Sequence, residues 1–126
     1  MFFISEDLTI NITRGDAAVI SVSAKFGGSD HEFRKRDVIR FKVFGKKDCA
    51  NVVLQKDVAV DEPTYAVDIE LTKEDTKIGS VINKPTDYWY EVELNPDTKP
   101  QTIVGYDEES GAKVFKLYPE GGVANE

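Results

Sequence analysis

The chain has 126 residues, with 16 Lys or Arg, 23 Asp or Glu and a formal net charge of −7. This length predicts a single domain, and 40% hydrophobic with 31% charged residues is an ordinary globular composition. The acidic balance disfavours nucleic acid as the main partner, because binding to phosphates needs a basic face. One Cys excludes an intrachain disulfide and a multi-Cys zinc site, and one His excludes the usual His-pair metal sites. We expect no metal, no cofactor, no small-molecule substrate and no membrane span, since no apolar run approaches the roughly 20 residues of such a span.

The N-terminus lacks the features of a targeting segment. Residues 1–4 are apolar, but Ser5, Glu6 and Asp7 follow at once. A signal peptide needs a basic start and a longer apolar stretch. The expectation is a chain without a signal peptide that folds in a reducing cytoplasm, which suits the single Cys49.

Apolar and polar residues alternate with a period of two in the first half of the chain, which is the pattern of half-buried strands. The predicted strands cover residues 6–13, 17–25, 37–45, 51–59 and 65–71. Residues 13–16 (TRGD) contain a glycine and predict a hairpin turn, so that the first two strands pair antiparallel. Residues 26–32, with two glycines, are predicted to form a loop.

One segment departs from the strand pattern. Thr72 is a capping residue with a carboxylate, Asp75, three positions later, and Gly79 is a plausible stop. This spacing predicts one or two helical turns over residues 72–79.

Three further strands are predicted at residues 88–94, 101–107 and 112–118, the last two joined by a hairpin turn at 107–111. Eight short strands with evenly spread turns predict an all-β fold, an antiparallel β-sandwich of about 7–8 strands, with a closed barrel as the alternative. Residues 1–120 would form this domain and 121–126 a flexible tail.

Several short motifs have plain structural interpretations. Arg14-Gly15-Asp16 matches an integrin-binding tripeptide, but turn chemistry alone explains it. Asn11-Ile12-Thr13 fits the N-glycosylation pattern, yet it lies inside a predicted strand. The acidic clusters at residues 61–62 and 107–109 lack the spacing of a calcium loop and are expected to be solvated.

The sequence offers little for catalysis, and we expect no enzymatic activity. No phosphate-binding glycine loop and no glycine-framed serine occurs. His31 lies in a polar stretch, and Cys49 has no His partner, although nearby lysines are able to lower its pKa. A small hydrolase built on paired carboxylates stays as a remote alternative.

The residues favoured for a partner interface are Trp89, Glu91, Arg34, Arg36 and Arg40. If Tyr88 and Tyr90 face the core, Trp89 stands on the outer face of its strand. An outward Trp marks either a protein interface, a surface covered by a helix, loop or tail, or a platform on which a sugar stacks. The one cluster of basic residues in the sequence contains Arg34, Arg36 and Arg40. It is either a binding site for an acidic partner or a solvent-exposed basic segment.

The order of these features resembles the small β-sandwich domains of tailed bacteriophages. It is similar to the N-terminal domain of phage baseplate upper proteins and to short prophage proteins of gut Firmicutes. The segments that carry the resemblance are 9–16 (TINITRGD), 37–43 (DVIRFKV), 71–76 (LTKEDT), 88–92 (YWYEV) and 115–120 (FKLYPE).

The resemblance implies an immunoglobulin-like sandwich that docks into a phage tail or baseplate, with no catalysis and no cofactor. Partners would be other tail or baseplate proteins, or further copies of the chain. The implied location is the bacterial host cytoplasm during assembly and then the virion. Baseplate upper proteins continue into a long receptor-bearing part, so a stand-alone adaptor is the expected role here. The alternative function is a carbohydrate-binding sandwich that uses Trp89.

Overall fold

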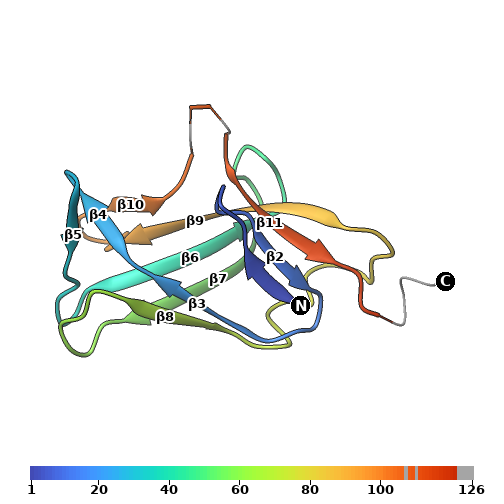
Figure 1. Ribbon diagram of the computed structural model, residues 1–126, viewed down its shortest axis with the longest axis horizontal. Coiled ribbons are helices and arrows are strands. Elements are labelled where there is room, and N and C mark those ends of the chain that lie inside the picture. Colours follow the sequence, from blue (N-terminus) through green and yellow to red (C-terminus); the bar gives the residue numbers. More distant parts are fainter. Residues whose placement is uncertain (107, 110, 122–126) are drawn as a thin grey trace.

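The computed structural model describes residues 1–106, 108–109 and 111–121. These residues form eleven β-strands and no helix (Figure 1). The strands are β1 (Phe2–Ile4), β2 (Ile10–Thr13), β3 (Ala18–Val22), β4 (Ala24–Phe26), β5 (Ser29–His31), β6 (Val38–Phe44), β7 (Val52–Ala59), β8 (Val67–Leu71), β9 (Thr86–Leu94), β10 (Gln101–Val104) and β11 (Lys113–Tyr118). Since these residues contain no helix, none of them forms a helix that could span a bilayer.

The strands form one large and one small sheet. The large sheet has seven strands in the order β1-β2-β11-β9-β6-β7, with β10 also paired to β9. The small sheet contains β3 and β8, and β4 and β5 form a separate hairpin that follows β3 along the chain. β9 is central, because β6 pairs along one of its sides while β10 and β11 pair end to end along the other.

This distribution of strands is that of an immunoglobulin-like sandwich. In that fold the second and fifth strands lie in one sheet, and the third, sixth and seventh lie in the other with an added edge strand. Here β3 and β8 occupy the first set, while β11, β9, β6 and β7 occupy the second. The predicted all-β sandwich class is therefore confirmed, with eleven strands in place of the 7–8 expected. One pairing departs from the antiparallel prediction, since β2 and β11 run parallel.

Alternate side chains from the two sheets meet in a single apolar core. In β9 the inward positions Tyr90, Val92 and Leu94 are buried, as their period of two predicts. Each apolar side chain taken fully out of water contributes roughly 1.5–3 kcal/mol. The largest fully buried side chains are Phe33, Phe41, Phe115, Ile10, Ile12, Ile39, Ile69, Leu71, Leu94, Leu117, Val43 and Val92.

The predicted hairpin at residues 13–16 is wrong, because this segment crosses from one sheet to the other. β2 pairs with β1 and β11, whereas β3 pairs with β8. The crossing is held by Arg14, whose buried guanidinium donates to the carbonyls of Ile78 and Gly79 at 3.4 and 2.9 Å and to Glu120 at 2.8 Å. Gly15 adopts a φ of 87°, which suits the sharp change of direction.

The predicted loop at residues 26–32 is also wrong in part, because β4 and β5 form a tight hairpin there. Phe26 pairs with Ser29 across Gly27 and Gly28, whose φ angles are 61° and 83°. Two successive positive φ angles are what a two-residue hairpin turn of the primed type requires. His31 then packs edge-on between the Phe26 and Phe33 rings, at centroid distances of 5.0 and 5.5 Å.

No helix forms at residues 72–79. The predicted reciprocal cap is nevertheless present: the Thr72 N–H donates to Asp75 Oδ2 at 2.8 Å, and the Asp75 N–H donates to Thr72 Oγ1 at 3.1 Å. The chain makes a single turn over residues 73–76 and then leaves it. Thr76 explains the early end, because its hydroxyl bonds to the Asp16 carbonyl and the Gly15 N–H of the sheet crossing instead.

The predicted hairpin between residues 101–107 and 112–118 does not form from paired strands. β10 pairs with residues 92–94 of β9, and β11 pairs with residues 86–90 on the same side of β9. The two strands therefore continue one another along β9, and the chain leaves the sheet between them (Figure 1). Residues 107 and 110 of the predicted turn, and residues 122–126 of the predicted tail, lie outside the described residues.

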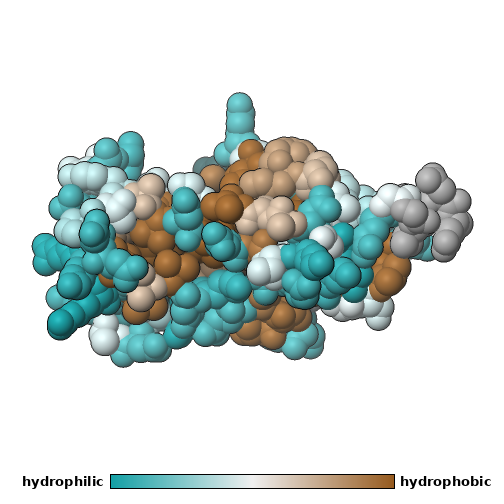
Figure 2. Space-filling view, turned by 90° about the horizontal axis from the view of Figure 1, so that it is seen from below, coloured by the Kyte–Doolittle hydropathy of each residue, from teal (hydrophilic) through white to brown (hydrophobic). Residues whose placement is uncertain are grey.

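The small sheet is too narrow to cover the whole inner face of the large one. Seen from the side of β7 and β8, apolar surface shows between charged side chains (Figure 2). Lys56 closes part of the gap between these strands, since its Nζ lies 2.8 Å from Asp75 Oδ2 beyond the end of β8. Burial opposes ionisation of Asp75, but hydrogen bonds from Lys56 and Thr72 outweigh it and lower its pKa.

We predict that Arg14→Met destabilises the fold by about 2–3 kcal/mol. The change leaves two loop carbonyls and the Glu120 carboxylate without their shared donor in a mostly buried place. Urea unfolding measures the effect, with Arg34→Met at an exposed position as the control. Equal stability of the two variants would contradict the role assigned to Arg14.

Candidate functional site

The outer face of the large sheet, which points away from the small sheet, gathers most of the residues singled out from the sequence. It is built from alternate positions of neighbouring strands: Arg40, Lys42 and Phe44 of β6; Trp89, Glu91 and Glu93 of β9; Val114 of β11; and Val52 and Asp57 of β7. Their registers place Lys42 opposite Glu91 and Phe44 opposite Trp89. We call this surface the outer face.

One part of the outer face is a network of ion pairs centred on Arg40. Its guanidinium donates to both carboxylate oxygens of Asp57, at 2.9 and 3.0 Å, and to those of Asp97, at 3.3 and 3.0 Å. Asp57 lies on the neighbouring strand and Asp97 in the turn after β9. The hydrogen bonds from Arg40 hold the pKa of Asp57 below its usual value.

Next to this network, Lys42 lies between two glutamates of β9. Its Nζ is 3.6 Å from Glu91 Oε1 and 3.3 Å from Glu93 Oε1. Partial burial and the charge of Glu93 raise the pKa of Glu91, and Lys42 only partly offsets them. With Asp57 and Asp97, four carboxylates surround two cations, so this part of the face is acidic.

The other part of the outer face is apolar. Trp89 is partly buried between its register partners Phe44 and Val114, as the predicted outward orientation requires. Phe44 is itself buried, whereas Val52, its partner on β7, is 50% exposed. An aromatic group that is partly accessible beside fixed charges has the composition of a protein-binding surface.

The structure brings together three of the five predicted interface residues. Trp89, Glu91 and Arg40 share the outer face. Arg34 and Arg36 are exposed in the loop before β6, at the end of that strand remote from Phe44 and Trp89. Six residues of strand separate Val38 from Phe44, which is roughly 20 Å at the rise of a β-strand. The basic run and the tryptophan therefore do not form one patch.

Sequence reasoning missed Phe44, Val114, Asp57 and Asp97 as neighbours of these residues. Their place on the outer face follows from strand register, which the alternation pattern leaves open. Asp97 joins Arg40 through the turn after β9, where Asn95 adopts a φ of 49°. Asn tolerates the left-handed region, and it is a local signal of the turn together with Pro96 and Pro100.

Cys49 lies in the loop between β6 and β7, and nearby lysines do not lower the pKa of its thiol there. Burial raises the pKa of its thiol, and the charges of Glu91 and Asp48 add to that effect. Lys42 acts in the opposite direction but is outweighed. The thiol is therefore held in its less reactive protonated form.

The Arg14-Gly15-Asp16 and Asn11 motifs serve the fold. Arg14 is buried at the sheet crossing, and Asp16 forms an ion pair with the amino group of Met1. The Asn11 side chain is buried, donates to Ser5 Oγ at 3.0 Å and accepts from the Tyr118 hydroxyl at 3.0 Å. The Arg14 and Asn11 side chains are both buried and hydrogen-bonded, so neither is free on the surface.

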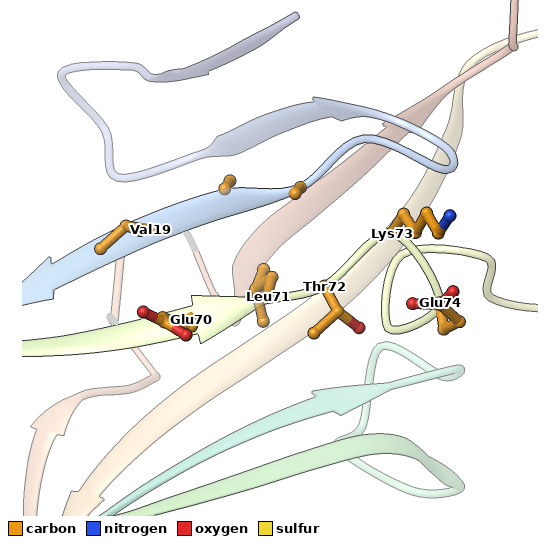
Figure 3. Close-up of a pocket in the computed structure, with 8 residues that line it drawn as sticks. Val19, Glu70, Leu71, Thr72, Lys73 and Glu74 are labelled. Carbon is orange, nitrogen blue, oxygen red and sulfur yellow. The ribbon is translucent and has the colours of Figure 1, made fainter.

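A shallow depression of about 450 Å³ lies at one end of the small sheet (Figure 3). Val19 and Leu71 contribute apolar side chains, and Glu70 and Glu74 lie on opposite sides of Thr72. Both glutamates are exposed to solvent. Among the residues that the structure describes, no group of three or more His, Cys, Asp or Glu is placed to hold a metal ion.

Comparison of the chain with protein-family models, curated proteins and solved structures finds no match. Its function is therefore inferred from its own surfaces.

We predict that Glu91 makes the fold less stable as the pH rises above the ordinary glutamate pKa of 4.5. A carboxyl whose pKa is raised by folding binds its proton more tightly in the folded state, so its favourable contribution is present below that pH and is lost above it. Glu91→Gln removes this contribution. The variant should gain stability relative to the native chain between pH 4 and pH 7, as measured by urea unfolding.

The matched control for this experiment is Glu62→Gln, which removes a carboxylate from an exposed loop. The difference in free energy of unfolding between Glu62→Gln and the native chain should change less with pH than the difference between Glu91→Gln and the native chain. If the free energy of unfolding of Glu91→Gln differs from that of the native chain by the same amount at every pH from 4 to 7, folding does not change the pKa of Glu91.

Proposed function

We propose that the protein is a non-enzymatic structural or assembly module that acts through protein–protein contacts on its outer face. The observation that carries the proposal is the juxtaposition of Trp89 with a fixed array of ion pairs on one sheet surface. Interfaces typically place an aromatic anchor inside a polar rim. Here Trp89 and Val52 supply the apolar part, and the Arg40 and Lys42 networks supply the rim.

The chemistry of the outer face favours a partner with basic residues beside an apolar patch. Four carboxylates around Arg40 and Lys42 leave the polar part of the face acidic, and the chain carries a net charge of −7. Complementary charge steers association and disfavours wrong partners. Because the charges are already paired within the sheet, the face is largely organised before a partner arrives.

The setting proposed for this contact is a phage or prophage tail or baseplate, with the protein as an adaptor. The support is the order of short sequence segments that resembles phage β-sandwich domains, together with the immunoglobulin-like strand order. Self-association in a symmetric assembly is the related possibility, since such assemblies reuse one surface on every copy.

We predict that Trp89→Ala weakens binding to a tail or baseplate partner at least about tenfold, because anchor residues dominate interface energies. The purified products of genes adjacent to this one are tested by sedimentation with and without the protein. Tyr65→Ala, at a 58% exposed position on a different segment, is the matched control and should bind normally.

A native chain that stays monomeric and binds none of these products would overturn the proposal. Equal binding by Trp89→Ala and Tyr65→Ala would show that the outer face is not the binding surface. Binding to a glycan array that depends on Trp89 would instead favour the carbohydrate-binding alternative. Circular dichroism establishes that Trp89→Ala still folds, since its side chain is partly buried.

A further inference from the structure

A second surface, separate from the outer face, lies where the small sheet ends at β3. Among the described residues, β3 pairs with β8 alone and β4 pairs with β5 alone. The other edge of β3 therefore presents backbone N–H and C=O groups that have no strand partner. In an antiparallel pair, alternate residues direct these groups away from the partner strand.

An apolar groove of about 280 Å³ runs beside this free edge. Its residues come from β3, from the inner face of the large sheet, from β10 and from the N-terminal segment. They include Ile4, Leu8, Ile20, Val22, Tyr90 and Ile103. Ile4 and Leu8 on the rim are each 42% exposed. A strand added to the free edge of β3 would lie beside these residues.

The wall opposite β3 is held in place by internal hydrogen bonds. The buried Tyr90 hydroxyl donates to the Leu8 carbonyl at 2.6 Å, and burial together with the nearby charge of Asp7 raises its pKa. The Leu8 N–H donates to the Ser5 carbonyl at 2.9 Å, which closes the turn between β1 and β2. A groove with fixed walls loses little entropy when it is filled.

We propose that this groove accepts an extended strand from a partner protein, which pairs with β3 and inserts alternate apolar side chains. Strand addition needs an unpaired sheet edge for main-chain bonds and a pocket for every second side chain, and both occur here side by side. This surface is independent of the outer face and goes beyond the function proposed above.

Charge complementarity indicates that the inserted strand carries basic flanks. Glu6 and Asp7 are exposed on the turn that carries Leu8, while Ser21 and Ser23 on the β3 side are uncharged. Asp7 precedes the groove residue Leu8 in the chain, and its pKa is lowered mainly by hydrogen bonds from Thr9, with a smaller effect from Lys113. The net charge of −7 attracts a basic segment at longer range.

The test uses a capped synthetic peptide in which valine alternates with threonine between terminal lysines. Calorimetric titration of the full chain should show saturable binding, and hydrogen exchange should slow at every second amide of β3, those that point away from β8. The same peptide with a central proline lacks an N–H and should not bind. Binding of both peptides with equal affinity would overturn the proposal, as would binding of neither.

Two matched variants locate the site. Leu8→Asp places a charge on the groove rim, at a φ of 68° that Asp tolerates, and should weaken peptide binding about tenfold or more. Val81→Asp makes the same change at a 61% exposed position outside the groove and should leave binding intact. Equal losses in the two variants would overturn the proposal.

Two further measurements separate this site from other interactions. Trp89→Ala should bind the peptide normally, so failure of strand addition is distinguishable from failure of the outer-face function. Sedimentation of the protein alone should give a monomer. Self-association that Leu8→Asp abolishes would make a second copy the occupant of the groove and overturn the assignment to a partner strand.

Discussion

The fold depends on the burial of apolar side chains between two sheets of unequal width. A two-stranded sheet covers part of the inner face of a seven-stranded one, and apolar area removed from water is the main favourable term. Where strands are missing, other contacts complete the boundary of the core. The Lys56–Asp75 ion pair bridges β7 and the turn after β8. His31 packs edge-on between the Phe26 and Phe33 rings beyond the end of β3. Arg14 holds the crossing between the two sheets. The groove beside β3 is the part of this boundary that no such contact fills.

β9 connects the core to the surface on which function is proposed. Its inward residues, such as Tyr90 and Val92, are buried, while Trp89 and Glu91 between them point outward. Because β6 and β11 pair along both sides of the Trp89 region, the outer face is positioned by the same ladder that supports the core. The strand groove is likewise held in place, since the Tyr90 hydroxyl fixes its opposite wall.

Much of the secondary structure was predictable, because period-two alternation reports directly on strands with one buried face. β6, β7, β9 and β11 lie within two residues of their predicted bounds. Most of the errors concern pairing, and two concern the predicted loop at residues 26–32 and the predicted helical turns at 72–79. The turn at residues 13–16 carries hairpin chemistry but joins different sheets, since alternation is the same whichever neighbour a strand acquires. The Gly27-Gly28 hairpin did have a local signal in its paired glycines. The cap at Thr72 formed as predicted, yet tertiary bonds to Thr76 ended the turn before it became a helix.

The sequence by itself determined the all-β class and the outward orientation of Trp89, because both follow from alternation along a single strand. It also excluded disulfide and multi-Cys metal chemistry through residue counts alone. The tertiary structure decided which strands are neighbours, and therefore that Trp89 and Arg40 share a face while Arg34 and Arg36 lie apart from Trp89. It also decided that β3 keeps a free edge beside an apolar groove. These features depend on contacts between residues far apart in the chain, and the order of side chains along one strand carries no information about its partner.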